Sequence, residues 1–259
     1  MASEFEPLSQ FRKKCLGGAI VTGTFQKTPS RQVAEVLSRS GLDFVVLDSE
    51  HAPFSIDVID DILASTRSRG FPILVRVGEP KASFIGACLD AGAAGIVVPH
   101  VTSADVAREA VSSLRFVGGG RGLSASGRAG DYGAMTLGTY MEQSDQAVSL
   151  WCQIEDVEAV DAIDEICSVN GVDALFVGRA DLMRSLGAVS VTDPSVVDAV
   201  QRIAEAGVKA GRRLAIFIVD VSEAAELRKI GFSIFVCGSD QSMLKSVAHS
   251  TATAVGAIR

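Results

Sequence analysis

Three acid-base side chains follow directly on a short apolar run in the segment VVLDSEHAPFS, residues 45–55. They are Asp48, Glu50 and His51, and the whole chain has only three histidines. An imidazole changes its charge near neutral pH, so this placement is a sizeable part of the chain's capacity for proton transfer. The segment predicts acid-base chemistry at the point where a buried strand reaches the surface.

The elements that position these residues repeat along the chain. Eight short runs are rich in apolar and β-branched residues, and each is nearly continuous, as expected for parallel strands covered on both faces. The runs are GGAIVTGTF, DFVVLD, PILVRV, AGIVVPH, SLWCQIE, DALFVG, LAIFIV and SIFVCG. Helix-like segments separate them. Eight such units in 259 residues favour an α/β fold in one domain, a (β/α)8 TIM barrel over residues 1–259. An open doubly wound sheet is the alternative, but no dinucleotide fingerprint follows the first run.

Start and stop signals support the helices between the runs. We expect helix starts at Thr28-Pro29, Ser103, Asp193-Pro194 and Ser222, because a capping residue or an early proline favours the first turn. Glycines at 41, 92, 171 and 231 lie where a left-handed residue would end a helix.

Composition excludes several classes of protein. Apolar residues make up 47% and charged residues 21%, which is typical of a soluble globular chain. The net charge of -7 argues against a nucleic-acid or anionic-membrane partner, since both require a basic surface. The five cysteines have no metal-binding or paired spacing and are expected to be buried free thiols. No apolar run is long enough to span a bilayer, and we expect a cytoplasmic protein.

Catalytic groups of a barrel lie at the carboxyl ends of its strands. After those of the second to sixth runs stand Asp48, Glu50, His51, Arg76, His100, Gln153, Glu155, Arg179, Asp181 and Arg184. Taken singly, Arg76 suits a structural ion pair, Glu155 a helix cap and Asp181 a turn, and His100 is interpreted as mainly structural. So many charged side chains at one end of the barrel favour a functional site over these separate structural roles. No lysine stands at a strand end within this set, which argues against Schiff-base chemistry.

The longest connection, residues 116–148, carries a glycine cluster at 118–122 and is expected to be functional or mobile. It lacks the spacing of a phosphate-binding P-loop. Barrels usually hold phosphate after strands seven and eight, where Asp220 and Asp240 are expected to repel an anion.

Several segments together resemble one family. LDSEHAPFS, VRVGEP, IVVPHVTSADVAREAVSSLRF, QIE, GVDALFVGRADL and FVCGSD are similar, in order and spacing, to motifs of the HpcH/HpaI aldolases. These are class II, metal-dependent pyruvate aldolases of the phosphoenolpyruvate/pyruvate superfamily, built on a β/α barrel. The resemblance runs from about residue 18 to the last helix.

The resemblance implies roles residue by residue. His51 would be the catalytic base, with Asp48 as its orienting partner, Glu50 in support and Arg76 facing the substrate oxygen. Glu155 and Asp181 would hold a divalent metal ion, Mg²⁺, Mn²⁺ or Co²⁺, since oxygen ligands suit these ions. Gln153 and the backbone at Gly178 and Ala180 would line the pyruvate pocket.

Some positions depart from the family pattern. Arg179 stands where proline is common, and His100 stands where methionine is common. We expect Arg179, His100 and Arg128 to shape a different acceptor pocket or to bind a second carboxylate.

The predicted activity is a carbon-carbon lyase that reversibly cleaves a 4-hydroxy-2-oxo acid to pyruvate and an aldehyde, by way of a pyruvate enolate at the metal. Alternatives are a related enzyme that acts on another oxo acid or a CoA thioester, as citrate-lyase-like or citrate-forming enzymes do, and a non-catalytic 2-oxo-acid binding protein. The resemblance also implies a homo-oligomer, often a hexamer, with the last helix, about residues 240–259, at an interface.

Overall fold

A computed structural model describes residues 5–258, and within them eight parallel strands close into one barrel in sequence order. The strands are Val21–Gln26 (β1), Phe44–Asp48 (β2), Ile73–Arg76 (β3), Gly95–Val98 (β4), Ser149–Ile154 (β5), Ala174–Val177 (β6), Arg213–Ile218 (β7) and Phe232–Ser239 (β8). Strand β8 pairs in parallel with β1, so no edge is left open. The predicted single-domain (β/α)8 barrel is confirmed, and the open sheet is wrong.

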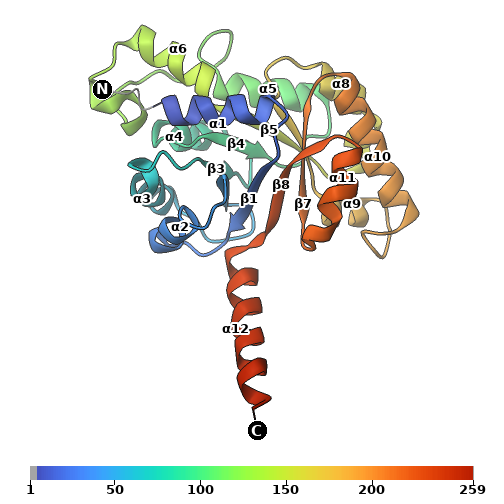
Figure 1. The fold of residues 1–259 in the computed structure, drawn as a ribbon. Helices are drawn as coiled ribbons and strands as arrows, with labels where there is room; N and C mark the ends of the chain where they lie inside the picture. The colour runs from blue at the N-terminus through green and yellow to red at the C-terminus, as the bar shows by residue number, and fades with distance from the viewer. Residues whose placement is uncertain (1–4, 259) are drawn as a thin grey trace.

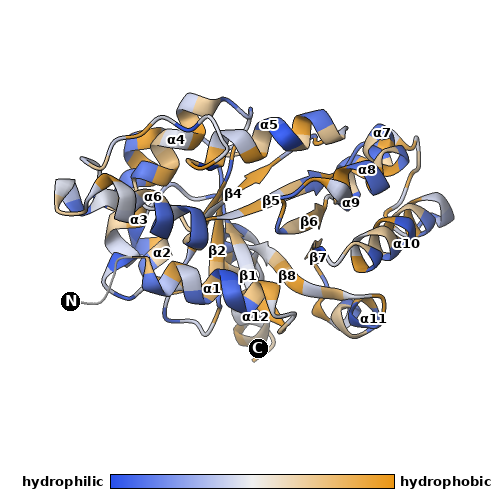
Figure 2. Ribbon diagram, turned by 90° about the horizontal axis from the view of Figure 1, so that it is seen from above, coloured by the Kyte–Doolittle hydropathy of each residue, from blue (hydrophilic) through white to orange (hydrophobic). Residues whose placement is uncertain are grey.

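Most of the helices surround the barrel wall, whereas α1 lies across one end of the barrel and α12 projects away from it (Figures 1 and 2). They are α1 (Glu6–Leu16), α2 (Arg31–Leu37), α3 (Ile56–Arg67), α4 (Ala82–Asp90), α5 (Ala104–Leu114), α6 (Leu137–Ala147), α7 (Val157–Asp161), α8 (Ile163–Ser168), α9 (Arg179–Ser185), α10 (Pro194–Lys209), α11 (Ala224–Lys229) and α12 (Asp240–Gly256). Two short 3₁₀ helices, η1 (Arg128–Gly133) and η2 (Val221–Glu223), lie before α6 and α11.

Two of the four predicted helix starts are confirmed. Ser103 caps α5 and Asp193 caps α10 through side-chain oxygens that accept backbone N–H groups. Helix α2 instead begins at Arg31, two residues beyond Pro29. Ser222 lies inside η2, and the cap of η2 is Asp220, whose carboxylate accepts the N–H of Ser222. All four predicted stop glycines have a positive φ, between 88° and 108°.

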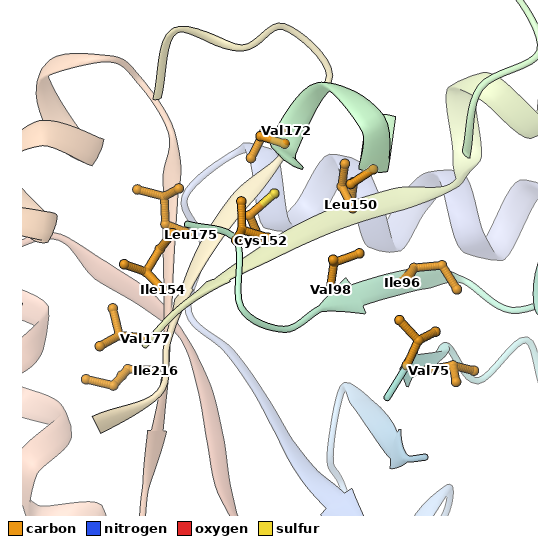
Figure 3. Packing of buried hydrophobic residues seen from close by; sticks show 14 of the residues in the cluster. Val75, Ile96, Val98, Leu150, Cys152, Ile154, Val172, Leu175, Val177 and Ile216 are labelled. Atoms are coloured by element: carbon orange, nitrogen blue, oxygen red, sulfur yellow. The ribbon is translucent and has the colours of Figure 1, made fainter. Parts of the chain in front are cut away.

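Two cores hold the barrel together. Inside it, buried aromatic rings fill the centre, with Trp151 edge-on to Phe44 at 5.3 Å between ring centroids. Outside it, branched residues of alternate strand positions, such as Val98, Leu150 and Val177, point toward the helices (Figure 3). Both faces of every strand are therefore covered, which explains why the strand sequences are continuous apolar runs.

The long connection 116–148 joins a helix to a strand, so it lies at the amino-terminal end of the barrel, away from the carboxyl ends of the strands. It is also not simply a loop, because it contains η1 and α6. Arg121 is buried there and donates to Asp90, Tyr140 and Ser144. This connection closes the opposite end of the barrel together with α1, which contacts α6, and its functional or mobile role stays a prediction.

Helix α12 leaves the barrel as a separate rod (Figure 1). Every residue from 241 to 258 is exposed. A cavity of about 440 Å³, lined by Ile20, Ile218 and Cys237 among others, lies beside β7, β8 and the start of β1. Among the described residues, no helix is both long and apolar enough to cross a membrane.

Candidate active site

The pairing of β2 with β3 brings two predicted residues together. Asp48 lies directly opposite Arg76 in the register of the strands, each at the last position of its strand. Nε and Nη2 of Arg76 donate to Oδ1 of Asp48 at 3.0 and 2.7 Å. The Asp48 carboxylate is fully buried and Arg76 is 6% exposed. The strand-end position that suggested both residues also makes them a buried ion pair.

A lysine completes this pair. Lys27 is the first residue after β1, and its Nζ lies 3.0 Å from Oδ2 of Asp48. The expectation that no lysine stands at a strand end in the site is therefore wrong. Burial alone would raise the pKa of Asp48, but Arg76 and Lys27 outweigh it and hold that pKa below its ordinary value. Because its amine is ion-paired, Lys27 is poorly suited to attack a carbonyl.

His51 is close to this pair, but its ring does not touch it. The backbone N–H of His51 donates to Oδ1 of Asp48 at 3.2 Å, while Nε2 of its imidazole lies 3.8 Å from Oε2 of Glu50. The His51 side chain is 54% exposed. The structure therefore does not form the expected Asp48–His51 dyad, since both oxygens of Asp48 already face cations. Glu50 is the carboxylate beside the His51 ring.

A second cluster lies beside the first. Glu50, His100 and Glu155 each offer one atom that could bind a metal ion, and the three atoms lie within 4.8 Å of one another. The backbone N–H of His100 donates to Oε1 of Glu155 at 3.0 Å, and Nδ1 of its ring lies 2.9 Å from Oδ2 of Asp156. His100 has a φ of 51°, which is costly for a residue other than glycine. Its interpretation as mainly structural stays a prediction, and its ring nitrogen is also one of the three atoms that could bind a metal ion.

Glu155 is the most deeply buried member of the cluster. It is 1% exposed, and burial raises the pKa of its carboxyl. Nε2 of Gln153 donates to Oε2 of Glu155. A Cβ at Gly178 would lie 2.7 Å from that same oxygen, so only glycine leaves the carboxylate its place.

The remaining predicted residues follow β6. Asp181 is not among the three clustered groups; its side chain is 37% exposed and Oδ1 lies 3.4 Å from Nε of Arg184. Arg179 is held by Glu223, with Nη1 2.6 Å from Oε2, and Nη2 donates to the carbonyl of Phe217 at 3.2 Å. The Arg179 guanidinium therefore fastens η2 to the barrel rim.

One cavity of about 320 Å³ lies beside these groups, although Asp48, Glu50, His100 and Glu155 do not line it. Its lining residues lie on the strands or in the segments that follow them, and they include Phe25, Lys27, His51, Arg76, Gln153, Gly178, Arg179, Ala180, Asp181, Ser239 and Ser242. Arg128 is not part of it. Nη2 of Arg128 lies 2.7 Å from Oδ2 of Asp60 on α3, at the amino-terminal end of the barrel. The hypothesis that Arg128 shapes the acceptor pocket is wrong.

Comparison with known proteins agrees with this arrangement. A family model described as HpcH/HpaI aldolase/citrate lyase matches residues 22–248. The chain belongs to this family. It is 32% identical to a 5-keto-4-deoxy-D-glucarate aldolase of Enterobacter sp. (strain 638), over 97% of this chain and 98% of that one. It is 31% identical to a hydroxypyruvate/pyruvate aldolase of Roseovarius nubinhibens, over 95% and 96% of the two chains.

Solved structures agree as well. An HpcH/HpaI aldolase/citrate lyase family protein from Burkholderia cenocepacia J2315 superposes with a TM-score of 0.90 at 29% identity, covering 95% of this chain and 99% of that one. A citrate synthase, SbnG, superposes with a TM-score of 0.85 at 29% identity, covering 95% and 97%. The predicted family and the class II aldolase activity are confirmed.

Proposed function

We propose that this HpcH/HpaI aldolase reversibly cleaves a 4-hydroxy-2-oxo acid to pyruvate and an aldehyde, using a divalent metal ion. The observation that carries the proposal is the buried Glu155 carboxylate, which two donors hold in place; one of them, Gln153, lines the cavity together with Arg76 and His51. The relatives named as aldolases of 5-keto-4-deoxy-D-glucarate and of pyruvate support this substrate class.

The residues present fit a divalent cation. Glu155 is buried without a lysine or arginine beside it among the described residues, and a buried carboxylate calls for a positive partner. We infer that Glu155 is one ligand and that Asp181, which lines the cavity, is the other, with Glu50 and His100 able to add an oxygen and a nitrogen. These donors suit Mg²⁺, Mn²⁺ or Co²⁺. The cation would stabilise negative charge that develops on the oxygen of the 2-oxo acid.

Arg76 shares that task from the other side. Two of its five N–H groups donate to Asp48, and Nη1 also lies within ion-pair distance of Glu50, 3.2 Å from its Oε2. The other three N–H groups remain for the substrate. Because Asp48 and Glu50 hold the guanidinium in place, it can donate to an enolate oxygen without reorganising. Gln153 and the backbone of Gly178 and Ala180 would line the carboxylate end of pyruvate.

His51 is the group that can move a proton. Its ring is half exposed at the cavity, and Glu50 lies beside Nε2. We therefore assign proton removal from the pyruvate methyl group to His51 and assign its support to Glu50, in place of Asp48.

Exchange of the methyl protons of pyruvate in D₂O tests the proposal, since it requires no aldehyde. NMR should show exchange by the wild type, loss of exchange in chelator and recovery with Mg²⁺ or Mn²⁺. His51→Ala should slow exchange by ~10²–10⁴-fold, the usual contribution of a positioned base. Exchange that persists unchanged in chelator or in His51→Ala would refute the mechanism. Exchange without cleavage of any hydroxy-oxo acid would favour a citrate-type condensation instead.

We also propose that α12 packs against another copy of the chain. It carries exposed Leu244, Val247 and Val255, which a monomer would leave in water. The apolar cavity beside β7 and β8 lies where the last helix of a barrel would otherwise return. A homo-oligomer built through α12, as predicted, would cover both surfaces.

A further inference from the structure

The backbone holds His100 against the buried carboxylate of Glu155. His100 follows the end of β4 by two residues, and its φ of 51° lies in the left-handed region, which is uncommon for residues other than glycine. Its N–H donates to Oε1 of Glu155 at 3.0 Å. Such a conformation persists only where the surrounding structure requires it. The position of the His100 imidazole beside the site is therefore fixed by the fold.

One ring nitrogen of His100 already has a partner. Nδ1 lies 2.9 Å from Oδ2 of Asp156, and an ionised carboxylate can only accept a hydrogen bond. Nδ1 therefore carries the proton, and Nε2 presents a lone pair. Histidines that bind metal ions are commonly oriented in this way, by a carboxylate that accepts from the ring nitrogen on the far side of the ion.

The lone pair of Nε2 faces another acceptor. Oε1 of Glu50 lies 3.8 Å from Nε2, while Oε2 of Glu50 lies 3.2 Å from Nη1 of Arg76. A separation of 3.8 Å is too long for a hydrogen bond, so a shared proton does not join Glu50 to His100. Two metal–ligand bonds of about 2.1 Å each can join atoms that lie up to about 4.2 Å apart. The space between the two side chains therefore suits a metal ion better than a proton.

A buried amide oxygen next to this space supports a bound ion. Gln153 is 2% exposed and donates through Nε2 to Oε2 of Glu155. Its own Oε1 is buried and has no hydrogen-bond partner among the described residues. A buried acceptor without a donor is costly. An ion bound at Glu155, together with the water molecules that it carries, would supply the missing partner.

We propose that Nε2 of His100 is a ligand of the divalent ion and that this nitrogen makes the enzyme prefer Co²⁺ to Mg²⁺. The inference rests on the proposed function. Imidazole nitrogen suits transition-metal ions, whereas Mg²⁺ prefers oxygen ligands and keeps several of its water molecules. The carboxylates of Glu155 and Asp181 suit either ion, so His100 is the group that distinguishes them.

The first test compares the dissociation constants of Mg²⁺ and Co²⁺ by calorimetry on metal-free protein at one fixed pH. His100→Asn removes the nitrogen but tolerates the left-handed backbone, so the hydrogen bond to Glu155 is kept. It should lower the preference for Co²⁺ by at least about 10- to 100-fold, the range for loss of a residue that merely orients a ligand. Asp156→Ala should lower the preference in the same direction, and Asp156→Asn should keep most of it. His249→Asn, which removes an exposed histidine of α12, is the matched control and should change neither constant.

The second test detects the nitrogen directly. Pulsed electron paramagnetic resonance of the Mn²⁺-loaded wild type should show modulation by a bound nitrogen, and His100→Asn should abolish it. His51→Asn should keep the modulation, because His51 is not among the clustered groups. A wild type without nitrogen modulation, modulation that persists in His100→Asn, or an unchanged preference for Co²⁺ overturns the inference.

The same measurements separate this inference from the proposed function. Glu155→Gln should weaken the binding of both ions. If the wild type binds neither Mg²⁺ nor Co²⁺, the metal-dependent function fails and the role of His100 fails with it. If both ions bind through Glu155 and no nitrogen is detected, only the role of His100 is refuted.

Discussion

Replacing Asp48 by asparagine tests the electrostatics on which the site depends. The substitution keeps the shape of the side chain but removes the charge that Arg76 and Lys27 share. Asp48 is fully buried and Arg76 nearly so, and breaking a buried pair by removing one partner costs about 3–5 kcal/mol. Lys27 is 32% exposed, so its pair with Asp48 adds no more than about 1 kcal/mol. We expect Asp48→Asn to lower the free energy of unfolding by about 3–5 kcal/mol at pH 7.

The cost should depend on pH in a defined direction. Asp48 has a pKa below its ordinary 3.8 in the folded state, so on acidification the unfolded chain takes up the proton first. The stability that this carboxylate contributes is fully present above pH 3.8 and is lost as the pH falls from there through the lowered folded-state pKa. The difference between wild type and Asp48→Asn should be constant from pH 7 to about 5 and should shrink below about 4.

A double-mutant cycle identifies the cause. In Asp48→Asn the amide N–H₂ faces the Lys27 ammonium, so two donors oppose each other. Lys27→Met should cost little alone and should recover about 1–2 kcal/mol in the asparagine background. Urea unfolding at one fixed protein concentration measures all four free energies, because subunit association also contributes to stability. Additive costs within about 0.5 kcal/mol, or a cost that does not shrink in acid, would refute the reasoning.

Three further predictions concern the metal, the arginine and the last helix. Burial raises the pKa of Glu155 above its ordinary 4.5, so in metal-free protein its contribution to stability is full below pH 4.5 and is lost as the pH rises through the raised value. Mn²⁺ should therefore raise the Tm more at pH 7.5 than at pH 5, and Glu155→Gln should remove the difference; an equal rise at both pH values would contradict this. Arg76→Met should slow pyruvate exchange by ~10²–10³-fold without rescue by excess metal, as expected for a lost oxyanion donor. Removal of residues 241–259 should reduce the mass in sedimentation to that of a monomer, and a wild type that sediments near 27.1 kDa would refute the α12 interface.

The sequence was sufficient to predict the barrel. A strand that is covered on both faces is a continuous apolar run, whereas an amphipathic strand alternates apolar and polar residues, so the sequence distinguishes the two. Eight continuous runs that alternate with helices are compatible with few folds other than the barrel. The end of each run is also local information, so Asp48, Arg76 and Glu155 could be named as site residues from their positions. Lys27 also stands at a strand end, directly after the β1 run, so its place in the site is predictable from the sequence in the same way.

The tertiary structure alone decided which of these side chains meet. Whether Asp48 faces His51, three residues away, or Arg76, 28 residues away, depends on the register between β2 and β3, which is set by long-range pairing. The same holds for His100 and Glu155, which follow the neighbouring strands β4 and β5. Arg128 shows the converse, because its chemistry suited the pocket but its connection lies at the other end of the barrel. Residue type and local pattern fix the chemistry that is available, whereas closure of the barrel fixes the distances that turn it into a site.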